Sequence, residues 1–284
     1  MSERVFIIGP GHVGRGLFRA FRASGIDVVG LHGKRPSAVA TSSGAIPAEV
    51  AHANVVMLCV RDSQLDDAVG EVQVAAADGR LQRGTVVLHT SAIAEPRGLA
   101  DLGQAGFPGG TFHPLIPFSD PEVSAELLRK GWIGIDGENA AKNASRRLAA
   151  HIGARTLEIP PGKKPAYHAA AVISSNFPVV LASVAGRLLH DIGIPDSSAY
   201  QAVESLMSGA LANMKQALPD DALTGPVVRG DAETVGKHLR GLQDHKSALA
   251  VYRALSSAAV DIAARRGIDA KKLAAVAGIL RAGK

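Results

Sequence analysis

The sequence predicts an α/β domain built on a mostly parallel, doubly wound sheet, followed by an all-helical domain. Three observations support this. Short, near-continuous apolar runs alternate with helical patterns over residues 1–160, which is typical of parallel strands covered on both faces. A glycine-rich turn joins the first apolar run to the first helical pattern. From residue 161 onward, long Ala/Leu/Val stretches keep helical spacing and contain no convincing strand.

Strand and helix patterns divide the chain into two predicted domains. Strand-like runs occupy residues 5–8, 27–31, 55–60, 85–89, 110–113, 132–136 and 155–159, and helical patterns occupy 14–24, 63–78 and 138–152. Pro160 and Pro161 mark a boundary, which gives domains over residues 1–160 and 161–284. A long helix is predicted over residues 166–192, where Pro178 predicts a kink because proline removes a backbone hydrogen bond.

Composition and charge narrow the functional class. Apolar residues make up 46% and charged residues 20% of the chain, as in soluble globular proteins, and no segment is expected to span a membrane. The single cysteine, Cys59, indicates a reducing, cytoplasmic compartment. The net charge of +5 arises after residue 160, with 15 Lys/Arg against 10 Asp/Glu, while 16 of each precede it. These cations are scattered rather than interleaved with aromatics, so no nucleic-acid partner is expected.

The turn after the first strand has the spacing Gly-x-Gly-x-x-Gly and consists of Gly9, Pro10, Gly11, His12, Val13 and Gly14. Between a strand and a helix, the first glycine permits a tight turn and the second lets the backbone approach a pyrophosphate. The third lets helix and strand pack closely. The N–H groups at the start of the helix favour an anion. These six residues therefore predict a Rossmann-type dinucleotide site.

The end of the strand at residues 27–31 predicts which dinucleotide binds. NAD-specific folds place an acidic residue there for the ribose 2′-hydroxyl, whereas this chain continues with Lys34, Arg35 and Ser37. Two cations and a hydroxyl suit a 2′-phosphate through charge-assisted hydrogen bonds. A solvated basic turn is the alternative interpretation. NADP(H) is favoured over NAD(H).

Two further strand ends are predicted to line the cofactor, because parallel strands present their carboxyl ends to the ligand. Val60, Arg61 and Asp62 follow one strand, and Asp62 either lines the cofactor or caps the next helix. Thr90 and Ser91 follow another strand. Their hydroxyls either face the nicotinamide or satisfy the strand end.

Four segments carry a more specific pattern, namely residues 87–91, 112–115, 167–177 and 223–231, the last followed by residues 234–239. With them the chain resembles the Rossmann-like proteins whose C-terminal part is named domain of unknown function 2520. That group is similar to the superfamily of 6-phosphogluconate, hydroxyisobutyrate and ketopantoate dehydrogenases and reductases. The resemblance implies an N-terminal dinucleotide domain, an all-helical C-terminal domain of the 6-phosphogluconate dehydrogenase type, and a homodimer.

One position departs from the hydroxy-acid branches of that superfamily. There, a lysine four residues before an asparagine on the long helix serves as acid and base, whereas Val172 stands four residues before Asn176 here. The lysine mechanism therefore does not carry over. His168 is the predicted proton carrier, because a free imidazole titrates near pH 6.5. Ser175 and Asn176 follow on the same predicted helix and would position the substrate; the alternatives are a core histidine and a structural amide beside Pro178.

Three further residues are predicted to act on the substrate. His113 ends a strand, and it either polarises a carbonyl or imine or is a loop histidine held by Pro114. Arg229 would bind a substrate carboxylate or phosphate in bidentate geometry. Asp231 would orient Arg229, or it caps the helix that follows.

These residues predict a cytoplasmic, NADP(H)-dependent oxidoreductase. A hydride would pass to or from a C=O or C=N carbon of a small, acidic substrate in the cleft between the two domains. Two alternatives stay open: a non-catalytic module that binds or senses NADP(H), and a reductase of a second cofactor such as a deazaflavin. No metal-ligand motif is present, and no membrane partner is expected.

Overall fold

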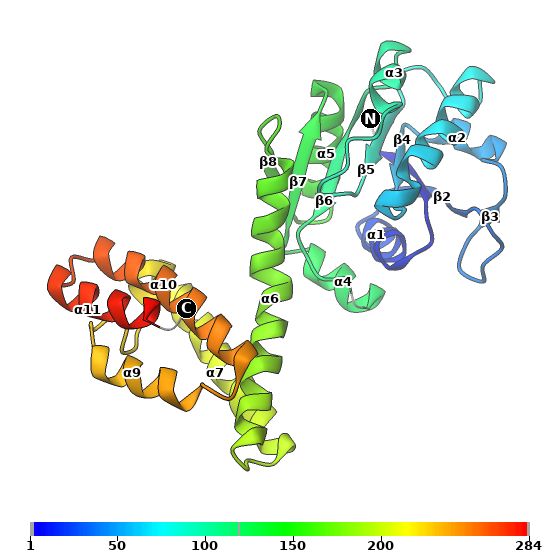
Figure 1. Cartoon of the computed structure of the whole chain (residues 1–284). Helices are drawn as coiled ribbons and strands as arrows, with labels where there is room; N and C mark the ends of the chain where they lie inside the picture. Colours follow the sequence, from blue (N-terminus) through cyan, green and yellow to red (C-terminus); the bar gives the residue numbers. More distant parts are fainter. Residues whose placement is uncertain (1–2, 119, 283–284) are drawn as a thin grey trace. The chain divides into compact units, whose positions relative to one another are not determined.

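The structure is a computed structural model that describes residues 3–118 and 120–282. It consists of two compact units, Met1–Ser175 and Asn176–Lys284, which divide inside the long helix α6 (Lys164–Asp191) (Figure 1). The units are defined by contacts alone, so the domain boundary at Pro160 stays a prediction.

The first unit contains one eight-stranded sheet in the order β3-β2-β1-β4-β5-β6-β7-β8. Its strands are β1 (Arg4–Ile8), β2 (Asp27–Gly33), β3 (Ser42–Ser43), β4 (Val55–Leu58), β5 (Val86–His89), β6 (Gly109–Pro114), β7 (Trp132–Gly137) and β8 (Arg155–Glu158). β6 and β7 pair antiparallel, and the other neighbours pair parallel. The predicted fold class is confirmed, and all seven predicted strands are present. The two-residue β3 was not predicted.

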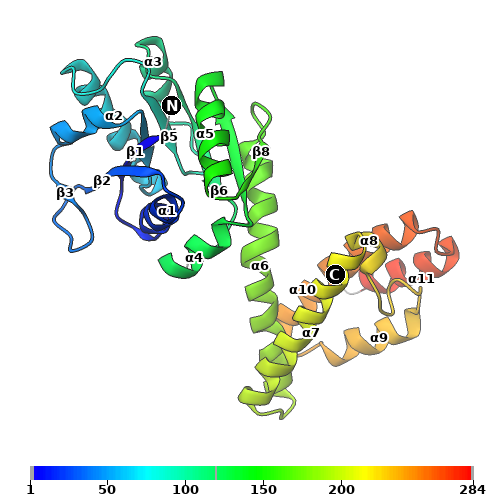
Figure 2. The same ribbon diagram turned by 180° about the vertical axis from the view of Figure 1, so that it is seen from behind.

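Alternation along the strands builds a core on each face of the sheet. On one face, Ile7 and Met57 pack with α1 (His12–Ala23), α4 (Pro121–Leu128) and α5 (Asn139–His151). Figure 2 brings these three helices to the front. On the other face, Phe6 and Leu58 pack with α2 (Leu65–Ala77) and α3 (Leu99–Gln104). Burial on both faces explains the near-continuous apolar runs of the sequence.

The start of α6 packs on the same face as α2 and α3. Its Tyr167 lies against Gly134 of β7, where an added Cβ would overlap the tyrosine hydroxyl. The neighbours of Gly134 in the strand, Ile133 and Ile135, are buried in the core on the opposite face. The glycine therefore lets α6 approach the sheet closely.

Within its described residues 176–282, the second unit contains helices joined by turns and loops, and no strand. After the end of α6 come α7 (Asp196–Gln216), α8 (Pro219–Ala222), α9 (Ala232–Gly241), α10 (Lys246–Arg265) and α11 (Ala270–Arg281). Val235, Leu239 and Val276 are the centre of its core. α6 runs continuously through Pro178, and the kink expected there stays a prediction.

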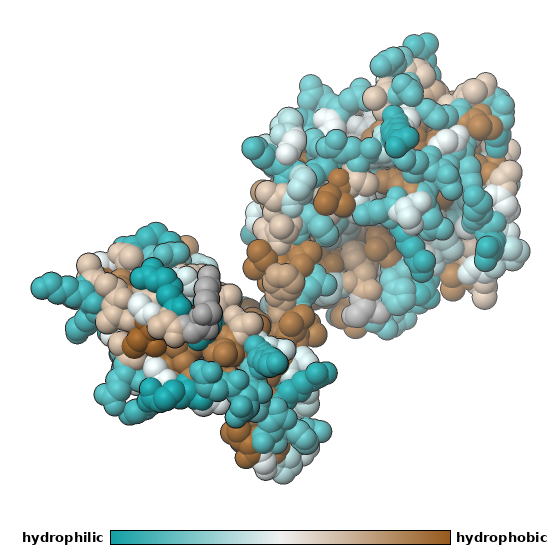
Figure 3. Space-filling view, in the orientation of Figure 1, coloured by the Kyte–Doolittle hydropathy of each residue, from teal (hydrophilic) through white to brown (hydrophobic). Residues whose placement is uncertain are grey.

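The middle of α6 exposes apolar side chains. Ile173, Val179 and Val180 are each more than half exposed, and Figure 3 shows hydrophobic residues gathered over this helix. By length and composition α6 is able to cross a membrane, a property that the sequence analysis did not anticipate for any segment. Core helices of soluble proteins pass the same test, so this feature alone does not place the helix in a membrane.

Candidate functional site

The glycine turn has the geometry that each glycine predicts. Gly9 has a φ of +111°, and its N–H donates to the His32 carbonyl at 2.8 Å. A Cβ on Gly14 would overlap the Gly9 carbonyl, so α1 packs closely on the turn only because this residue is glycine. A Cβ on Gly11 would meet nothing within 4 Å. The backbone at Gly11 therefore faces open space, as approach of a pyrophosphate requires.

A pocket of about 250 Å³ opens beside this turn, at the carboxyl ends of β1, β2 and β4. Gly9, Pro10 and Gly11 form one side, and Val60 and Arg61 form another. His12 and Val13 begin α1, directly after the turn. The pocket thus joins the predicted glycine turn to the predicted end of β4.

The cation Lys34 lines this pocket together with two acidic residues of α2, Asp67 and Glu71. The Lys34 ammonium lies 3.3 Å from a carboxylate oxygen of Glu71. Arg35 and Ser37 are exposed beyond the pocket, and the Ser37 hydroxyl lies 3.4 Å from the Val39 amide as a weak acceptor. Only Lys34 of the predicted phosphate-binding trio lines the pocket.

The hydroxyls at the end of β5 have partners within the chain. Thr90 donates to the Leu58 carbonyl at 3.3 Å, and Ser91 accepts from the Ala94 amide at 3.0 Å. These contacts satisfy the strand end, which was one of the two interpretations. Burial raises the pKa of the neighbouring Cys59 thiol to about 12, against a smaller opposing effect of its hydrogen bond with Thr90, so this cysteine is not a nucleophile.

Two predicted catalytic histidines lie together over β6. Nδ1 of His113 lies 2.8 Å from the Tyr167 hydroxyl. The rings of His113 and His168 have centroids 6.4 Å apart at an interplanar angle of 82°. Nδ1 of His168 is buried without a hydrogen bond within the described chain. α6 therefore places Tyr167 and His168 beside His113 at the end of β6, so that the two imidazoles lie next to each other and the tyrosine contacts His113.

Burial sets the protonation of His113 and Tyr167. It lowers the pKa of His113 to about 4, with His168 adding to the effect and the Asp62 carboxylate opposing it. Burial also raises the pKa of Tyr167. At neutral pH, His113 is a neutral imidazole and Tyr167 a neutral phenol. Asp62 follows Arg61, which lines the pocket beside the glycine turn, so this pocket and the histidines share one edge of the sheet.

Three polar residues extend the histidine pair along the same face, and none was predicted as a site residue. His89 of β5 is fully buried, and its Nε2 lies 3.2 Å from the Thr111 hydroxyl of β6. Burial lowers the pKa of His89 to about 3, with Lys164 and His113 adding to the effect. Lys164, only 5% exposed, begins α6. Strand register pairs His89 with Thr111, and the start of α6 adds Lys164. No local sequence motif marks these three residues.

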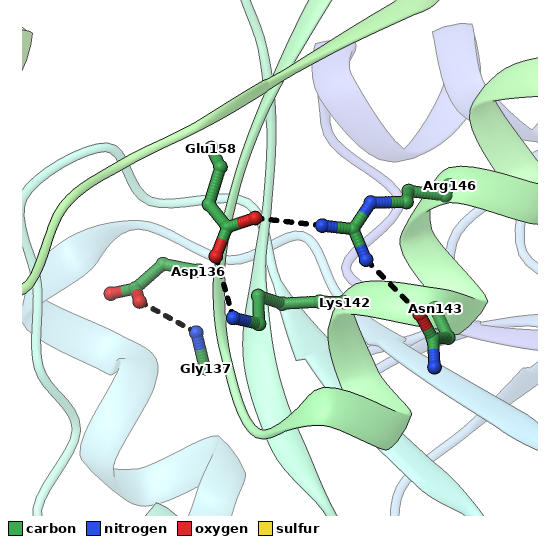
Figure 4. Close-up of polar contacts among 6 residues, drawn as sticks. All are labelled: Asp136, Gly137, Lys142, Asn143, Arg146 and Glu158. Atoms are coloured by element: carbon green, nitrogen blue, oxygen red, sulfur yellow. Dashed lines mark hydrogen bonds and ion pairs between the residues drawn. The ribbon is translucent and has the colours of Figure 1, made fainter.

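Lys164 has one ion partner in this region. Its ammonium lies 3.5 Å from Oδ2 of Asp136, and Oδ1 of Asp136 accepts from the Gly137 amide at 2.7 Å. Figure 4 shows that the nearby cations Lys142 and Arg146 bind Glu158 instead. Asp136 is therefore positioned to pair with Lys164.

The remaining predicted substrate-contacting residues are Ser175, Asn176, Arg229 and Asp231. Ser175 and Asn176 are exposed on α6. Asn176 is the first residue of the second unit, to which Arg229 and Asp231 also belong. Asp231 caps α9 by accepting from the Thr234 amide at 3.0 Å, which lowers the pKa of its carboxyl together with the Thr234 hydroxyl and Arg229. The capping interpretation thus has direct structural support. Roles of these four residues in catalysis stay predictions.

Within the described residues, no group of three or more His, Cys, Asp and Glu side chains is arranged to hold a metal ion. His238 and His245, which are seven residues apart, do not share a helix. His238 hydrogen-bonds to Tyr252, and His245 precedes α10 and pairs with Asp191.

Solved structures share this fold. A protein from Thermotoga maritima is 23% identical, with 92% of this chain and 99% of that chain covered and a TM-score of 0.71. A pyrroline-5-carboxylate reductase from Coxiella burnetii is 14% identical (92% and 99% covered, TM-score 0.60). An imine reductase from Myxococcus stipitatus, in complex with NADP⁺, is 16% identical (95% and 98% covered, TM-score 0.60).

Sequence comparison finds a family match for part of the chain. No curated protein matches it, whereas residues 132–259 match the family described as Domain of unknown function (DUF2520). This segment includes β7, α6 and the turn before α9. The resemblance inferred from the motifs is confirmed over this segment: residues 132–259 match the DUF2520 family, and the chain has the Rossmann-type fold of the solved structures.

Proposed function

We propose that the chain is an NADP(H)-dependent oxidoreductase that acts on a C=O or C=N carbon of a small, acidic substrate. This proposal rests on the pocket at Gly11. There the unobstructed backbone of Gly11 and the side chain of Lys34 lie at the carboxyl edge of a parallel sheet. Such an edge is where open α/β sheets bind nucleotides. A bound nicotinamide supplies hydride transfer, and the protein must move the accompanying proton.

The histidine pair supplies the proton chemistry in this proposal. His113, neutral at pH 7, accepts at Nδ1 from the protonated Tyr167 hydroxyl. Its Nε2–H then donates a hydrogen bond that polarises the substrate oxygen or nitrogen. His168, 6.4 Å away between ring centroids, carries the proton. Neutral imidazoles are effective hydrogen-bond donors of this kind.

Two structurally similar proteins support NADP(H) as the cofactor and a C=N carbon as the reacting group. The imine reductase with the same fold is in complex with NADP⁺, and the Coxiella burnetii neighbour is a pyrroline-5-carboxylate reductase. At these identities the likeness shows the fold, so the assignment to this chain rests on its own pocket and histidines.

Calorimetric titration with NADPH and NADH tests the proposal. The wild-type chain is expected to bind NADPH more tightly, and Lys34→Ala/Arg35→Ala to lose that preference. Arg129→Ala/Lys130→Ala, an exposed cation pair after α4, is the matched control and should bind like wild type. Binding of neither nucleotide would overturn the oxidoreductase assignment. NADPH binding without any turnover of carbonyl or imine acids would instead favour a sensing module.

We also propose that the chain functions as a cytoplasmic homodimer. The exposed apolar side chains of α6, and Leu206 and Leu211 of α7, offer a face that a second copy would cover. Their burial in a dimer would remove apolar area from water, which favours association.

A further inference from the structure

Lys164 is a buried cation whose contacts are too long to satisfy it. An ammonium group has three N–H donors, and charge-assisted hydrogen bonds are ordinarily about 2.7–2.9 Å long. The two contacts of Lys164 are longer, at 3.3 Å to the Ala94 carbonyl and 3.5 Å to Asp136. Burying a charge with only weak hydrogen-bond partners is unfavourable in free energy. The Lys164 ammonium can therefore donate a further hydrogen bond to a stronger acceptor.

His89, beside Lys164, has a second unsatisfied group. Its Nε2 is bonded to Thr111, whereas its buried Nδ1 has no hydrogen-bond partner within the described chain. Buried polar atoms in proteins are nearly always paired. Two neighbouring buried groups, on different elements, therefore lack good partners.

Both groups line one pocket of about 370 Å³ between α3, β6 and the start of α6. Its inner residues, Lys164, His89 and Thr111, are buried and carry the polar atoms described above. Its acidic residues, Glu95 and Glu138, are exposed at the rim. The inner end thus presents the Lys164 ammonium and, from the hydrogen-bonded His89–Thr111 pair, one further N–H or O–H donor, which suit an anionic oxygen.

We propose that Lys164, with His89 and Thr111, binds the carboxylate of a small 2-oxo or 2-imino acid. This inference rests on the proposed function and specifies its substrate. Lys164 precedes His168 by one helical turn, about 6 Å along the axis. Thr111 precedes His113 by two strand residues, about 7 Å. A ligand that spans from the lysine to the histidines is therefore short, with its reacting carbon adjacent to the carboxylate.

This assignment differs from the sequence-based one, in which Arg229 binds the acid group. Arg229 belongs to the second unit, whereas Lys164 and both histidines belong to the first. The carboxylate site proposed here is complete within the first unit. Binding of a carboxylate is therefore expected to be insensitive to Arg229→Ala.

Titration of the full chain without nucleotide tests the site. Pyruvate, 2-oxobutyrate and 2-oxoglutarate are the probes, with methyl pyruvate as the neutral analogue. At least one acid is expected to bind, and the ester is not. Lys164→Met should weaken that binding about 10- to 100-fold, the loss of one hydrogen bond to a charged group. Lys164→Arg should retain part of it, and Lys163→Met is the matched control beside it.

Each outcome decides the proposal. No binding of any acid to the folded wild-type chain, an equal effect of Lys163→Met, or unchanged binding by Lys164→Met overturns it. Thermal melting of the variants checks folding, and Lys164→Arg provides a second, charge-preserving comparison. NADPH titration reports separately on the pocket at Gly11, which Lys164 does not line. Loss of nucleotide binding with intact acid binding would reject the oxidoreductase while the carboxylate site stands.

Discussion

Lys34 and Glu71 form an ion pair of 3.3 Å across the pocket that the glycine turn opens. The cation expected to receive a 2′-phosphate therefore already has an anionic partner. A phosphate would compete with Glu71 for Lys34 and would also be repelled by it. The chain's preference between NADPH and NADH thus depends on this carboxylate as well as on the basic turn.

Glu71→Gln is expected to strengthen NADPH binding about two- to fivefold, with a smaller effect on NADH. The pair is partly exposed, and such pairs contribute up to about 1 kcal/mol. Paired calorimetric titrations measure both affinities. Glu126→Gln, on the exposed side of α4, controls for net charge. Weaker NADPH binding, or an equal gain for NADH, would contradict the competition.

Gly11 and Gly14 are expected to respond differently to alanine. A Cβ on Gly11 meets open space, so Gly11→Ala should fold with a loss of at most about 1 kcal/mol at the helix N-cap and bind nucleotide at least about tenfold more weakly. A Cβ on Gly14 overlaps the Gly9 carbonyl, so Gly14→Ala should lower the free energy of unfolding by several kcal/mol, roughly as overpacked sites do. Denaturant titration and calorimetry separate the two effects. Wild-type nucleotide affinity in Gly11→Ala would contradict the role of its backbone.

Folding stability is expected to fall as the pH is lowered from about 6.5 towards 4. The folded-state pKa values of His113 and His89 are about 4 and about 3, below the roughly 6.5 of an unfolded histidine. The unfolded chain therefore binds more protons in this window, and the stabilisation present above pH 6.5 is lost as the pH falls. Because one pKa unit corresponds to about 1.4 kcal/mol, the loss from the two histidines together should reach several kcal/mol by pH 4.

Denaturant titrations across this pH range measure that loss. His113→Gln should reduce the dependence by about half, because glutamine does not titrate there and only the contribution of His89 remains. His151→Gln, at an exposed position on α5, should leave it unchanged. A wild-type stability that is constant between pH 7 and pH 4 would show that neither buried histidine has a depressed pKa.

The features predicted correctly from the sequence are local ones. The glycine turn, the seven strands and the long α6 each follow from residues that are close together in the chain. Lys164 and His89 were missed because they are 75 positions apart, and only the pairing of β5 with β6 brings His89 beneath α6. The adjacent Lys163 and Lys164 after Pro160-Pro161 are typical of a solvated turn. His113 and His168 were found separately, and their contact follows from the close approach at Gly134.

Asp231→Ala is expected to destabilise the chain by about 1 kcal/mol, the usual effect of losing an N-cap. Asp231→Asn should restore most of that stability, because asparagine caps as well as aspartate. The same pair of variants at Asp269, which caps α11 through the Lys272 amide at 3.0 Å, is the matched control. If Asp231→Asn instead retained stability but abolished turnover, its carboxylate would have a role beyond the cap.

The exposed face of α6 is expected to lie in a dimer interface. Light scattering should then give twice the chain mass of 29.3 kDa, and Val179→Asp/Val180→Asp should give the monomer, because burying two unpaired carboxylates is unfavourable. Val74→Asp alters an apolar residue of α2 that is 56% exposed, and it should leave the mass unchanged. A monomeric wild-type chain that partitions into vesicles would point to a membrane as the partner of α6. A monomeric chain that does not bind vesicles would show that this face of α6 is exposed to water, which would exclude both a second copy and a membrane as its partner.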